Sequence, residues 1–352
     1  MEPETKRPNV QKKKQSNKGL WWGIGLVTLL GVAVGVWMSR MPQKAIAYYY
    51  RHQGQEALDN GEMDPAIAHF SAALDHYASG EIYLQRGLAH QQQENWRLAQ
   101  DDFSQAIQLD PNLEQAFYKR GNIRFQLGDR QGALEDYTSA IAINPDTVKA
   151  YVNRGSVRGD LGDEVGAIDD YSEAIQNDPS FAQAYANRCL SRSNIEDYQG
   201  AIADCTQAIG LKPNSVRAYQ NRGHARRQLG DSLGALEDFN IAINLDPDDP
   251  DPYFNRGLAR LELGDRIGAI DDYTEAINRK PDHALAYYER GLARAETDDH
   301  LGAIADFRTS GKLCLDAGRQ GCYEDAQYHI TQIHQQEIPT SSEPSPSFDP
   351  LE

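Results

Sequence analysis

The stretch RGNIRFQLGDRQGALEDYTSAIAINP, residues Arg120 to Pro145, decides the fold because edited copies of it recur along the chain. An arginine and a proline each return every 34 residues, at Arg86, Arg120, Arg154, Arg188, Arg222, Arg256 and Arg290, and at Pro111, Pro145, Pro179, Pro213, Pro247 and Pro281. A period of 34 residues is typical of a solenoid built from pairs of helices. The sequence therefore predicts an all-α repeat fold.

Two amphipathic helices in each copy follow from the residues that recur. With Glu114 counted as position 1, position 4 is aromatic in every copy, and position 24 is aromatic except at Cys205. Positions 8, 20 and 27 are small, mostly Gly, Ala and Ala. These spacings place each set on one helical face. We expect the small residues to let the backbones approach and the rings to fill the space between them.

The turns can be predicted from their residues. A Gly-Asp pair such as Gly128-Asp129 or Gly162-Asp163 separates the two helices, and we expect Gly to end one helix and Asp to cap the next. After each recurring proline, a polar residue is expected to cap the first helix of the following copy. These residues are Asn112, Asp146, Ser180, Asn214 and Asp248.

The pattern resembles the tetratricopeptide repeat (TPR) family over eight copies in residues 45–317. The resemblance implies a right-handed α-solenoid whose first helices line a concave groove. The copies are similar to a variety common in bacterial, particularly cyanobacterial, proteins. One departure is the arginine at position 7, where the family often has leucine. Residues 318–336 read as a final amphipathic helix that caps the open end of the array.

The segment before the repeats predicts a membrane anchor. Residues 20–38 carry no charge and are long enough to span a bilayer as one helix, after a basic, disordered stretch at 1–19. The excess of Lys and Arg before the span places the N-terminus in the cytoplasm and the repeats in a periplasm or lumen. Alternatively, Ala45-Ile46-Ala47 ends a cleaved signal peptide. Residues 337–352, rich in Pro and Ser, predict a disordered tail.

The distribution of charge along the chain limits the kinds of molecule that can bind to it. Residues 1–44 carry eight Lys or Arg and two Glu, whereas the remainder carries 27 basic and 50 acidic side chains. So acidic a solenoid repels nucleic acid and anionic headgroups. We therefore expect a protein or peptide partner and no nucleic acid.

The recurring arginine has an equally regular carboxylate partner. Every Arg at position 7 is followed by an Asp at position 23, and position 11 is usually a second Arg. One interpretation is a row of anion-binding sites. We favour a ladder of ion pairs between helices, because a partly buried arginine needs a charged partner.

The four cysteines form two plausible pairs. Cys189 and Cys205 replace the Gly and the ring of one copy at positions expected to face each other, while Cys314 and Cys322 flank the last loop. In an extracytoplasmic domain, this favours two disulfides over packed thiols. A metal site from Cys314, Cys322, His329 and His334 is the alternative, but its spacing matches no common zinc pattern. We predict no metal and no cofactor.

No catalytic motif appears, so an enzyme is not expected. The groove positions that the resemblance implies are aromatic and polar in copy three, basic in copy six and apolar in copies seven and eight. They are Tyr118, Asn122, Phe125, Arg217, Gln220, His224, Arg227, Phe254, Leu258, Leu261, Leu285, Tyr288 and Leu292. An apolar cluster rimmed by polar groups marks an interaction site, unless the final helix, the tail or a second copy covers it.

The function predicted from the sequence is a non-enzymatic, membrane-anchored scaffold or assembly factor that binds a protein segment in its groove. A segment with hydrophobic anchors and a carboxylate would suit the basic copy six beside the apolar copies. The alternative is a structural protein of the cell envelope that associates with itself as a homo-oligomer.

Overall fold

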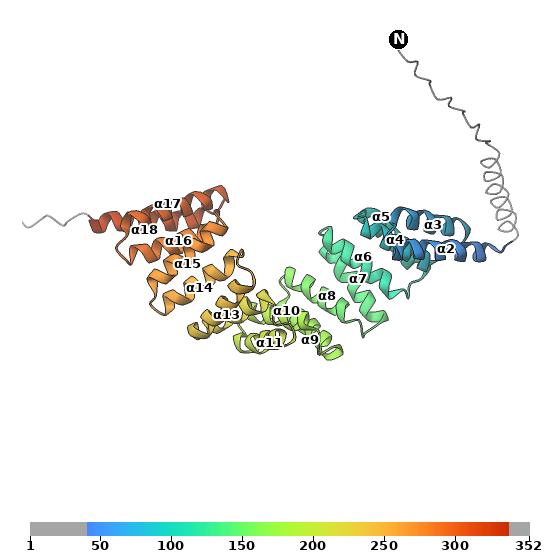
Figure 1. Cartoon of the computed structure of the whole chain (residues 1–352), viewed down its shortest axis with the longest axis horizontal. Helices are drawn as coiled ribbons and strands as arrows, with labels where there is room; N and C mark the ends of the chain where they lie inside the picture. The colour runs from blue at the N-terminus through green and yellow to red at the C-terminus, as the bar shows by residue number, and fades with distance from the viewer. Residues whose placement is uncertain (1–40, 338–352) are drawn as a thin grey trace, which may run out of the picture. The chain divides into compact units, whose positions relative to one another are not determined.

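The computed structural model describes residues 41–337, and every regular element in that range is an α-helix (Figure 1). The absence of strands from residues 41–337 confirms the all-α prediction. The helices are α2 Gln43–Asp59, α3 Met63–His76, α4 Gly80–Gln92, α5 Trp96–Leu109, α6 Glu114–Gln126, α7 Arg130–Ile143, α8 Val148–Asp160, α9 Glu164–Asn177, α10 Ala182–Asn194, α11 Tyr198–Leu211, α12 Val216–Gln228, α13 Ser232–Leu245, α14 Pro250–Glu262, α15 Arg266–Arg279, α16 Ala284–Ala295, α17 His300–Asp316 and α18 Gln320–Glu337.

Three predicted segments lie at or beyond the ends of the described range. The basic stretch 1–19 and the predicted membrane span 20–38 are outside it, and so is the predicted tail from residue 338 onward. Within residues 41–337, no helix combines the length and the apolar character that crossing a bilayer requires.

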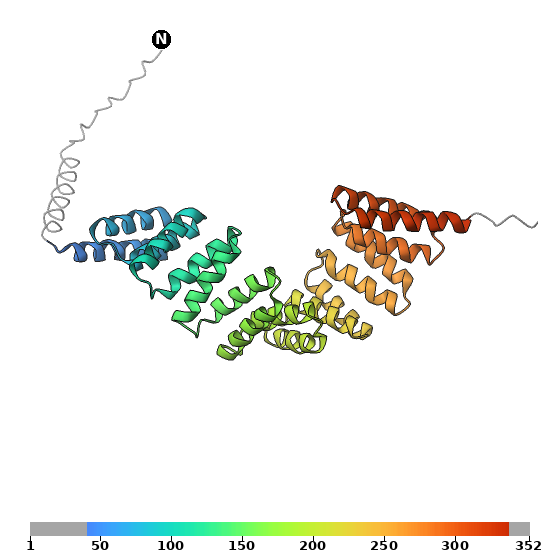
Figure 2. The same cartoon turned by 180° about the vertical axis from the view of Figure 1, so that it is seen from behind.

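The chain divides into two compact units, residues 1–127 and 128–352. In the first unit, α2 to α5 form two packed helix pairs and α6 lies against α5. In the second, α7 lies against α8, five pairs follow from α8–α9 to α16–α17, and α18 packs on α17. Figure 2 shows the same succession of helices from behind. Each copy of the sequence motif thus corresponds to two helices; we number the copies as repeats, so that repeat four is α8–α9 and repeat eight is α16–α17.

The two helices of a repeat approach closely because a glycine faces a ring. A Cβ atom built on Gly257 of α14 would lie 2.6 Å from the ring of Tyr273 on α15, and one on Gly87 would lie 2.6 Å from Phe103. Both rings are fully buried. The prediction that small residues at position 8 admit the rings at position 24 is therefore confirmed in these repeats.

At the four predicted Gly-Asp pairs the turn inside the repeat forms as the sequence predicts, whereas Glu94, Glu196 and Asp298 have the positive φ in three other repeats. Gly128, Gly162, Gly230 and Gly264 have positive φ, and the following Asp accepts a hydrogen bond from a backbone N–H of the next helix. Asp163, for example, accepts from Gly166 at 2.9 Å. Only glycine adopts this left-handed conformation without strain.

The turn between repeats differs from the prediction. Asn112, Asp146 and Ser180 do not cap the next helix, because the helix begins two residues later and its N-cap is Leu113, Thr147 or Phe181. The residue before the proline shapes the turn instead. Asp178 accepts hydrogen bonds from the backbone N–H and the hydroxyl of Ser180, at 2.9 and 2.6 Å. This local closure explains why polar residues cluster around each proline.

Helix α18 closes the apolar end of the second unit. Its buried residues Ala326, Ile330 and Ile333 pack in one cluster with Phe307 and Ile304 of α17. Without α18 this face of repeat eight would be exposed to water, which is the reason a solenoid needs a terminal cap.

Candidate functional site

In six of the repeats, a buried carboxylate joins the two helices. In six repeats the Arg at position 7 and the Asp at position 23 form an ion pair with N–O distances of 2.5–2.7 Å. From repeat four onward, the Arg at position 11 approaches the other carboxylate oxygen at 2.8–3.1 Å. The side chains of these Asp residues are only 1–6% exposed. Two guanidinium groups thus compensate one desolvated carboxylate.

The same arginines also bridge successive repeats within each unit. Nη1 of Arg188 donates to Ser172 Oγ of the preceding repeat at 2.9 Å, and Arg86, Arg154, Arg222, Arg256 and Arg290 make equivalent contacts. Each guanidinium also lies 5.4–5.8 Å from the aromatic ring at position 4 of its own helix. Because these groups are engaged inside the protein, the arrangement supports the ion-pair ladder and not a row of anion sites.

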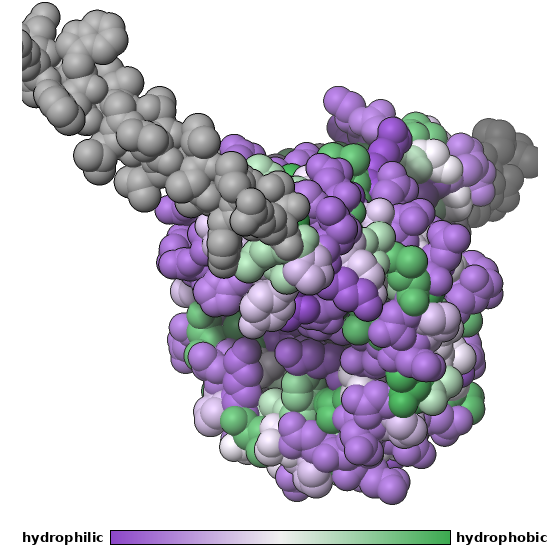
Figure 3. All heavy atoms as spheres, turned by 90° about the vertical axis from the view of Figure 1, so that its right-hand side faces the viewer, coloured by the Kyte–Doolittle hydropathy of each residue, from purple (hydrophilic) through white to green (hydrophobic). Residues whose placement is uncertain are grey.

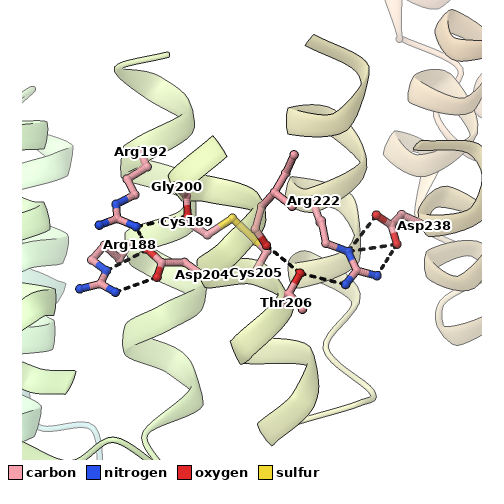
Figure 4. Close-up of a disulfide and its surroundings, with 10 residues drawn as sticks. Arg188, Cys189, Arg192, Gly200, Asp204, Cys205, Thr206, Arg222 and Asp238 are labelled. Atoms are coloured by element: carbon pink, nitrogen blue, oxygen red, sulfur yellow. Dashed lines mark hydrogen bonds and ion pairs between the residues drawn. A yellow bond between two sulfur atoms is a disulfide. The ribbon is translucent and has the colours of Figure 1, made fainter. Parts of the chain in front are cut away.

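The first cysteine pair lies inside repeat five, next to this ladder (Figure 4). Cys189 of α10 and Cys205 of α11 form a disulfide with a Cα–Cα distance of 5.5 Å, and both are fully buried. Arg188 and Arg192 lie beside it and both contact Asp204. The disulfide occupies the place where the other repeats pack a glycine against a ring.

The second pair, Cys314 and Cys322, joins α17 to α18 with a Cα–Cα distance of 5.9 Å. His329 is not directed toward these cysteines: its ring stacks on Phe307 at 5.2 Å and lies 5.6 Å from Tyr288. Among residues 41–337, no group of three or more potential metal ligands lies together.

Two adjoining hollows lie over the first helices of repeats four to seven. One, of about 320 Å³, is lined by Ser156, Gly159, Asp160, Glu164, Tyr171, Asn187, Leu190, Ser191, Asn194 and Arg217. The other, of about 270 Å³, is lined by Leu190, Ser193, Asn194, Gln220, Asn221, His224, Asp251 and Asn255. They share Leu190 and Asn194 of α10, so they form one continuous groove, which we call the α10 groove.

The lining of the α10 groove is dominated by amides and hydroxyls. Asn187, Asn221 and Asn255 each stand one residue before the ladder arginine of their repeat. Leu190 is 49% exposed and supplies an apolar contact at the junction of the two hollows. On the face of the molecule shown in Figure 3, hydrophilic residues predominate and hydrophobic ones occur in small patches.

Three of the residues predicted for repeat six line the α10 groove. Arg217 is exposed and lines the first hollow, and it forms no ion pair with the described part of the chain. Gln220 and His224 line the second. Gln220 donates to Asp249 at 2.6 Å. Burial lowers the pKa of His224, and the charge of Arg227 lowers it further, so the imidazole is neutral at pH 7.

Arg227 is paired with a residue of the neighbouring repeat. It forms an ion pair with Glu262 of α14 at 2.7 Å, and Ser232 also binds this carboxylate. Repeat six therefore presents less free positive charge than its composition predicts, and Arg217 carries what remains.

The apolar residues predicted for repeats seven and eight are largely packed. Phe254 is buried against Tyr273 and His283, and Leu258 and Leu261 pack against the same cluster. Tyr288 and Leu292 pack against the cluster that α18 completes. Leu285 alone of this predicted set remains half exposed, at 50%.

The residues predicted for repeat three lie on α6 at the end of the first unit. Tyr118 and Asn122 are half-buried, and Phe125 is 38% exposed. Neither hollow of the α10 groove is lined by them.

Sequence reasoning missed the asparagines, although a signal was present. Asn153, Asn187, Asn221 and Asn255 follow the 34-residue period, immediately before the ladder arginine. Their regularity was hidden behind the stronger arginine pattern, and whether such a residue faces a hollow depends on the side chains around it.

Comparison with known families gives one consistent result. Models described as TPR repeat or tetratricopeptide repeat match residues 80–113, 121–162, 223–264 and 254–310. No curated protein matches the chain.

Solved structures with a similar fold share little sequence with this chain. A tetratricopeptide repeat protein from Parabacteroides merdae ATCC 43184 is 16% identical with a TM-score of 0.51, and the match covers 71% of this chain and 99% of that one. The APC/C hetero-tetramer Cut9–Hcn1 gives 13% identity, a TM-score of 0.57, and coverage of 77% and 52%. PilW, described as a widely conserved type IV pilus biogenesis factor, is 19% identical with a TM-score of 0.51. The match covers 57% of this chain and 94% of PilW. These identities establish a shared fold and nothing finer.

Proposed function

The chain belongs to the tetratricopeptide repeat family, and on this premise we propose that it is a non-enzymatic scaffold that binds a segment of another protein in the α10 groove. Proteins of this repeat family mediate protein–protein interactions. The observation that carries the proposal is the pair of adjoining hollows, which share Leu190 and Asn194 and run across four successive repeats. Their continuity suits an extended segment better than a compact small molecule.

The chemistry of the groove favours a polar contact surface with one apolar anchor. Leu190 is exposed at its centre, and Arg217 is available to an acidic group at the repeat-four side. A segment with one hydrophobic side chain over Leu190 and a carboxylate near Arg217 fits this arrangement, because an aliphatic contact and a charged rim recur at protein interfaces.

The scaffold is membrane-anchored in this proposal. Residues 20–38 supply the span and the basic residues before it keep the N-terminus in the cytoplasm, so the groove lies in a periplasm or lumen. Two disulfides fit such an oxidising compartment. Its role there would be to assemble or hold proteins of the same envelope.

Site-specific photo-crosslinking tests the proposal in cells that make the full chain. A photoreactive side chain replaces Leu190 in the groove, and a matched one replaces Leu211, which is 43% exposed at the end of α11. We expect a discrete adduct from position 190 and none from position 211. Leu190 is a cleaner position than Leu258, because Leu258 packs against the core and its loss would also destabilise the fold.

The mass of the adduct separates the two functions that the sequence left open. An adduct with a different protein supports the scaffold. An adduct with the mass of two copies of the chain replaces it with self-association. Equal labelling from positions 190 and 211, or none from position 190, contradicts the groove as the binding site.

A further inference from the structure

We propose that repeats seven and eight hold a subsite for one cationic side chain, a lysine or an arginine, of the protein partner, with Glu289 of α16 as its counter-ion. The subsite lies among α14, α15 and α16, and α15 packs against both of the others. It is separate from the α10 groove, whose two hollows include no residue of α15 or α16. The inference rests on the proposed function only in taking its occupant from a bound protein.

The hydroxyl group of a buried tyrosine at position 24 needs a partner, and repeat four supplies one. Tyr171 donates to Ser156 Oγ at 3.3 Å, and Asn187 of the next repeat also forms a hydrogen bond with this hydroxyl. Ser156 stands at position 9 of its repeat and Asn187 at position 6 of the following one. Tyr273 of α15 stands at position 24 of repeat seven. Its hydroxyl should meet the same two positions, because no insertion separates the repeats.

In repeats seven and eight these two positions supply no partner. Leu258 stands in place of the serine and Glu289 in place of the asparagine. Tyr273 is fully buried, and its hydroxyl oxygen forms no hydrogen bond within residues 41–337. Buried polar groups are nearly always paired, so the unpaired hydroxyl indicates that a group from another molecule is missing.

Glu289 is the second unsatisfied group, and it lies close to the first. Its side chain is half-buried and forms neither an ion pair nor a hydrogen bond with the described part of the chain. Burial raises the pKa of Tyr273 and the charge of Glu289 raises it further, so the carboxylate lies near the hydroxyl. Arg227 is the cation that acts on Glu289, but Glu262 already holds it at 2.7 Å.

The charges around the subsite select a cation. Glu262 and Glu289 are two carboxylates that share the single guanidinium of Arg227. Next to Glu289, burial raises the pKa of Tyr288, and the charges of Asp325 and Glu289 raise it further. An anionic group would therefore be repelled. An ammonium or guanidinium group would neutralise Glu289 and could donate both to its carboxylate and to the tyrosine hydroxyl oxygen.

The apolar residues beside Glu289 suit the stem of such a side chain. Leu258 and Leu261 are only partly buried, and Leu285, one helical turn before Glu289, is 50% exposed. Lysine and arginine pack their methylene groups along apolar surface and keep the charged group at a polar site. Within residues 41–337 no three potential metal ligands lie together, so the cation that fits is an organic one.

The test measures how strongly a defined probe binds to the full chain, held in nanodiscs of phosphatidylcholine, by fluorescence anisotropy. The probe is a capped, labelled peptide with one lysine between alanines. In the comparison probe, norleucine replaces lysine, which keeps the stem and removes the ammonium group. We expect the lysine probe to bind about tenfold more tightly, because only the ammonium group can pair with Glu289 and donate hydrogen bonds.

Two variants remove one polar group each and keep its shape. Glu289→Gln should abolish the preference for the lysine probe. Tyr273→Phe should weaken binding of that probe about threefold, because it removes only the hydroxyl acceptor. Neither change breaks a contact of the free protein, since both groups are unpaired in it. Glu237→Gln, at an exposed position of α13, is the matched control: it changes the net charge equally and should leave binding unchanged. Circular dichroism checks that each variant is folded.

The outcomes separate this inference from the proposed function. Equal affinity of the wild type for the two probes, or an unchanged preference in Glu289→Gln, overturns the subsite. Equal weakening by Glu237→Gln and Glu289→Gln also overturns it, because the acidic chain then attracts cations without a specific site. If a partner is still crosslinked at position 190 in these cases, the scaffold function stands without the subsite. If position 190 captures nothing while the lysine probe binds as expected, the subsite stands and the groove proposal falls.

Discussion

Arg188 of α10 donates two hydrogen bonds to Asp204 of α11, at 2.8 and 2.7 Å, and a third to Ser172 of the preceding repeat, at 2.9 Å. One side chain thus connects both helices of its repeat and the repeat before it. Asp204 is 3% exposed, so its charge depends on this arginine and on Arg192 for compensation. The arginine that recurs every 34 residues therefore marks a recurring structural ion pair.

Removing Arg188 should destabilise the fold more than removing an ordinary surface arginine. Arg188→Ala leaves Asp204 buried with one cation fewer, and we expect a loss of about 3 kcal/mol in the free energy of unfolding, measured by urea denaturation. Arg308→Ala, at an exposed position of α17, is the control and should change it by less than about 0.5 kcal/mol. Asp204→Ala combined with Arg188→Ala should cost less than the sum of the single changes. If the free-energy losses of the two single variants added strictly in the double variant, the ion-pair ladder would be contradicted.

The disulfide of repeat five should be replaceable by the pair that the other repeats use. Cys189→Gly with Cys205→Tyr restores a ring over a glycine, as at Gly155 and Tyr171. We expect reductant to destabilise this double variant less than the wild type, because only the Cys314–Cys322 bond remains to be reduced. The wild type should lose about 2–4 kcal/mol on reduction, because the reduced chain regains the freedom of a closed loop.

The Cys314–Cys322 bond is present in both the wild type and the double variant. The difference between their responses to reductant therefore measures the contribution of the Cys189–Cys205 bond. Cys205→Tyr alone should be less stable than the double variant, since the Cβ of Cys189 then meets the ring. Equal stability of the single and double variants would show that the two positions do not share one space.

A methyl group on Gly257 should be harmful. The added Cβ would lie 2.6 Å from Tyr273, a fully buried ring that cannot move aside cheaply. We expect Gly257→Ala to cost about 1–3 kcal/mol through overpacking. In Gly210→Ala on α11 the new Cβ meets no atom within 4 Å, and this variant should be stabilised by up to about 1 kcal/mol. The melting temperature of each variant is the measurement. If both substitutions shifted it in the same direction, the close approach at Gly257 would be contradicted.

Glu289 of α16 should make stability depend on pH. Burial raises the pKa of this carboxyl group above its ordinary value, and the charge of Arg227 only partly opposes this shift. A raised folded-state pKa gives stability that is fully present below the ordinary pKa of glutamate and is lost as the pH rises through the folded pKa. We therefore expect Glu289→Gln to melt at a higher temperature than the wild type at pH 7 and at a similar temperature near pH 4. Glu237→Gln, at an exposed position of α13, should show no such difference between the two pH values.

Several residues that the sequence predicts to be free in the groove are packed or paired in the structure. Phe254, Tyr288 and Leu292 look like free apolar groups on a helical projection, but Tyr273, Phe307 and α18 pack against them. Arg227 looks like free charge, but Glu262 neutralises it. A projection of one helix does not show what a neighbouring helix places against it, whereas the α10 groove is lined by residues of five helices.

The sequence by itself determined the all-α repeat architecture, the Gly-Asp turns, the partners of the ladder and the pairing of Cys189 with Cys205. Each of these depends on residues that recur at one period, so local propensity and spacing are sufficient to predict them. Only the tertiary structure decided which groove positions stay open, that α18 covers Tyr288 and Leu292, and that Leu190 stays exposed where the two hollows meet. The physical reason is that burial and hydrogen-bond satisfaction are properties of several packed helices, and no single repeat contains them.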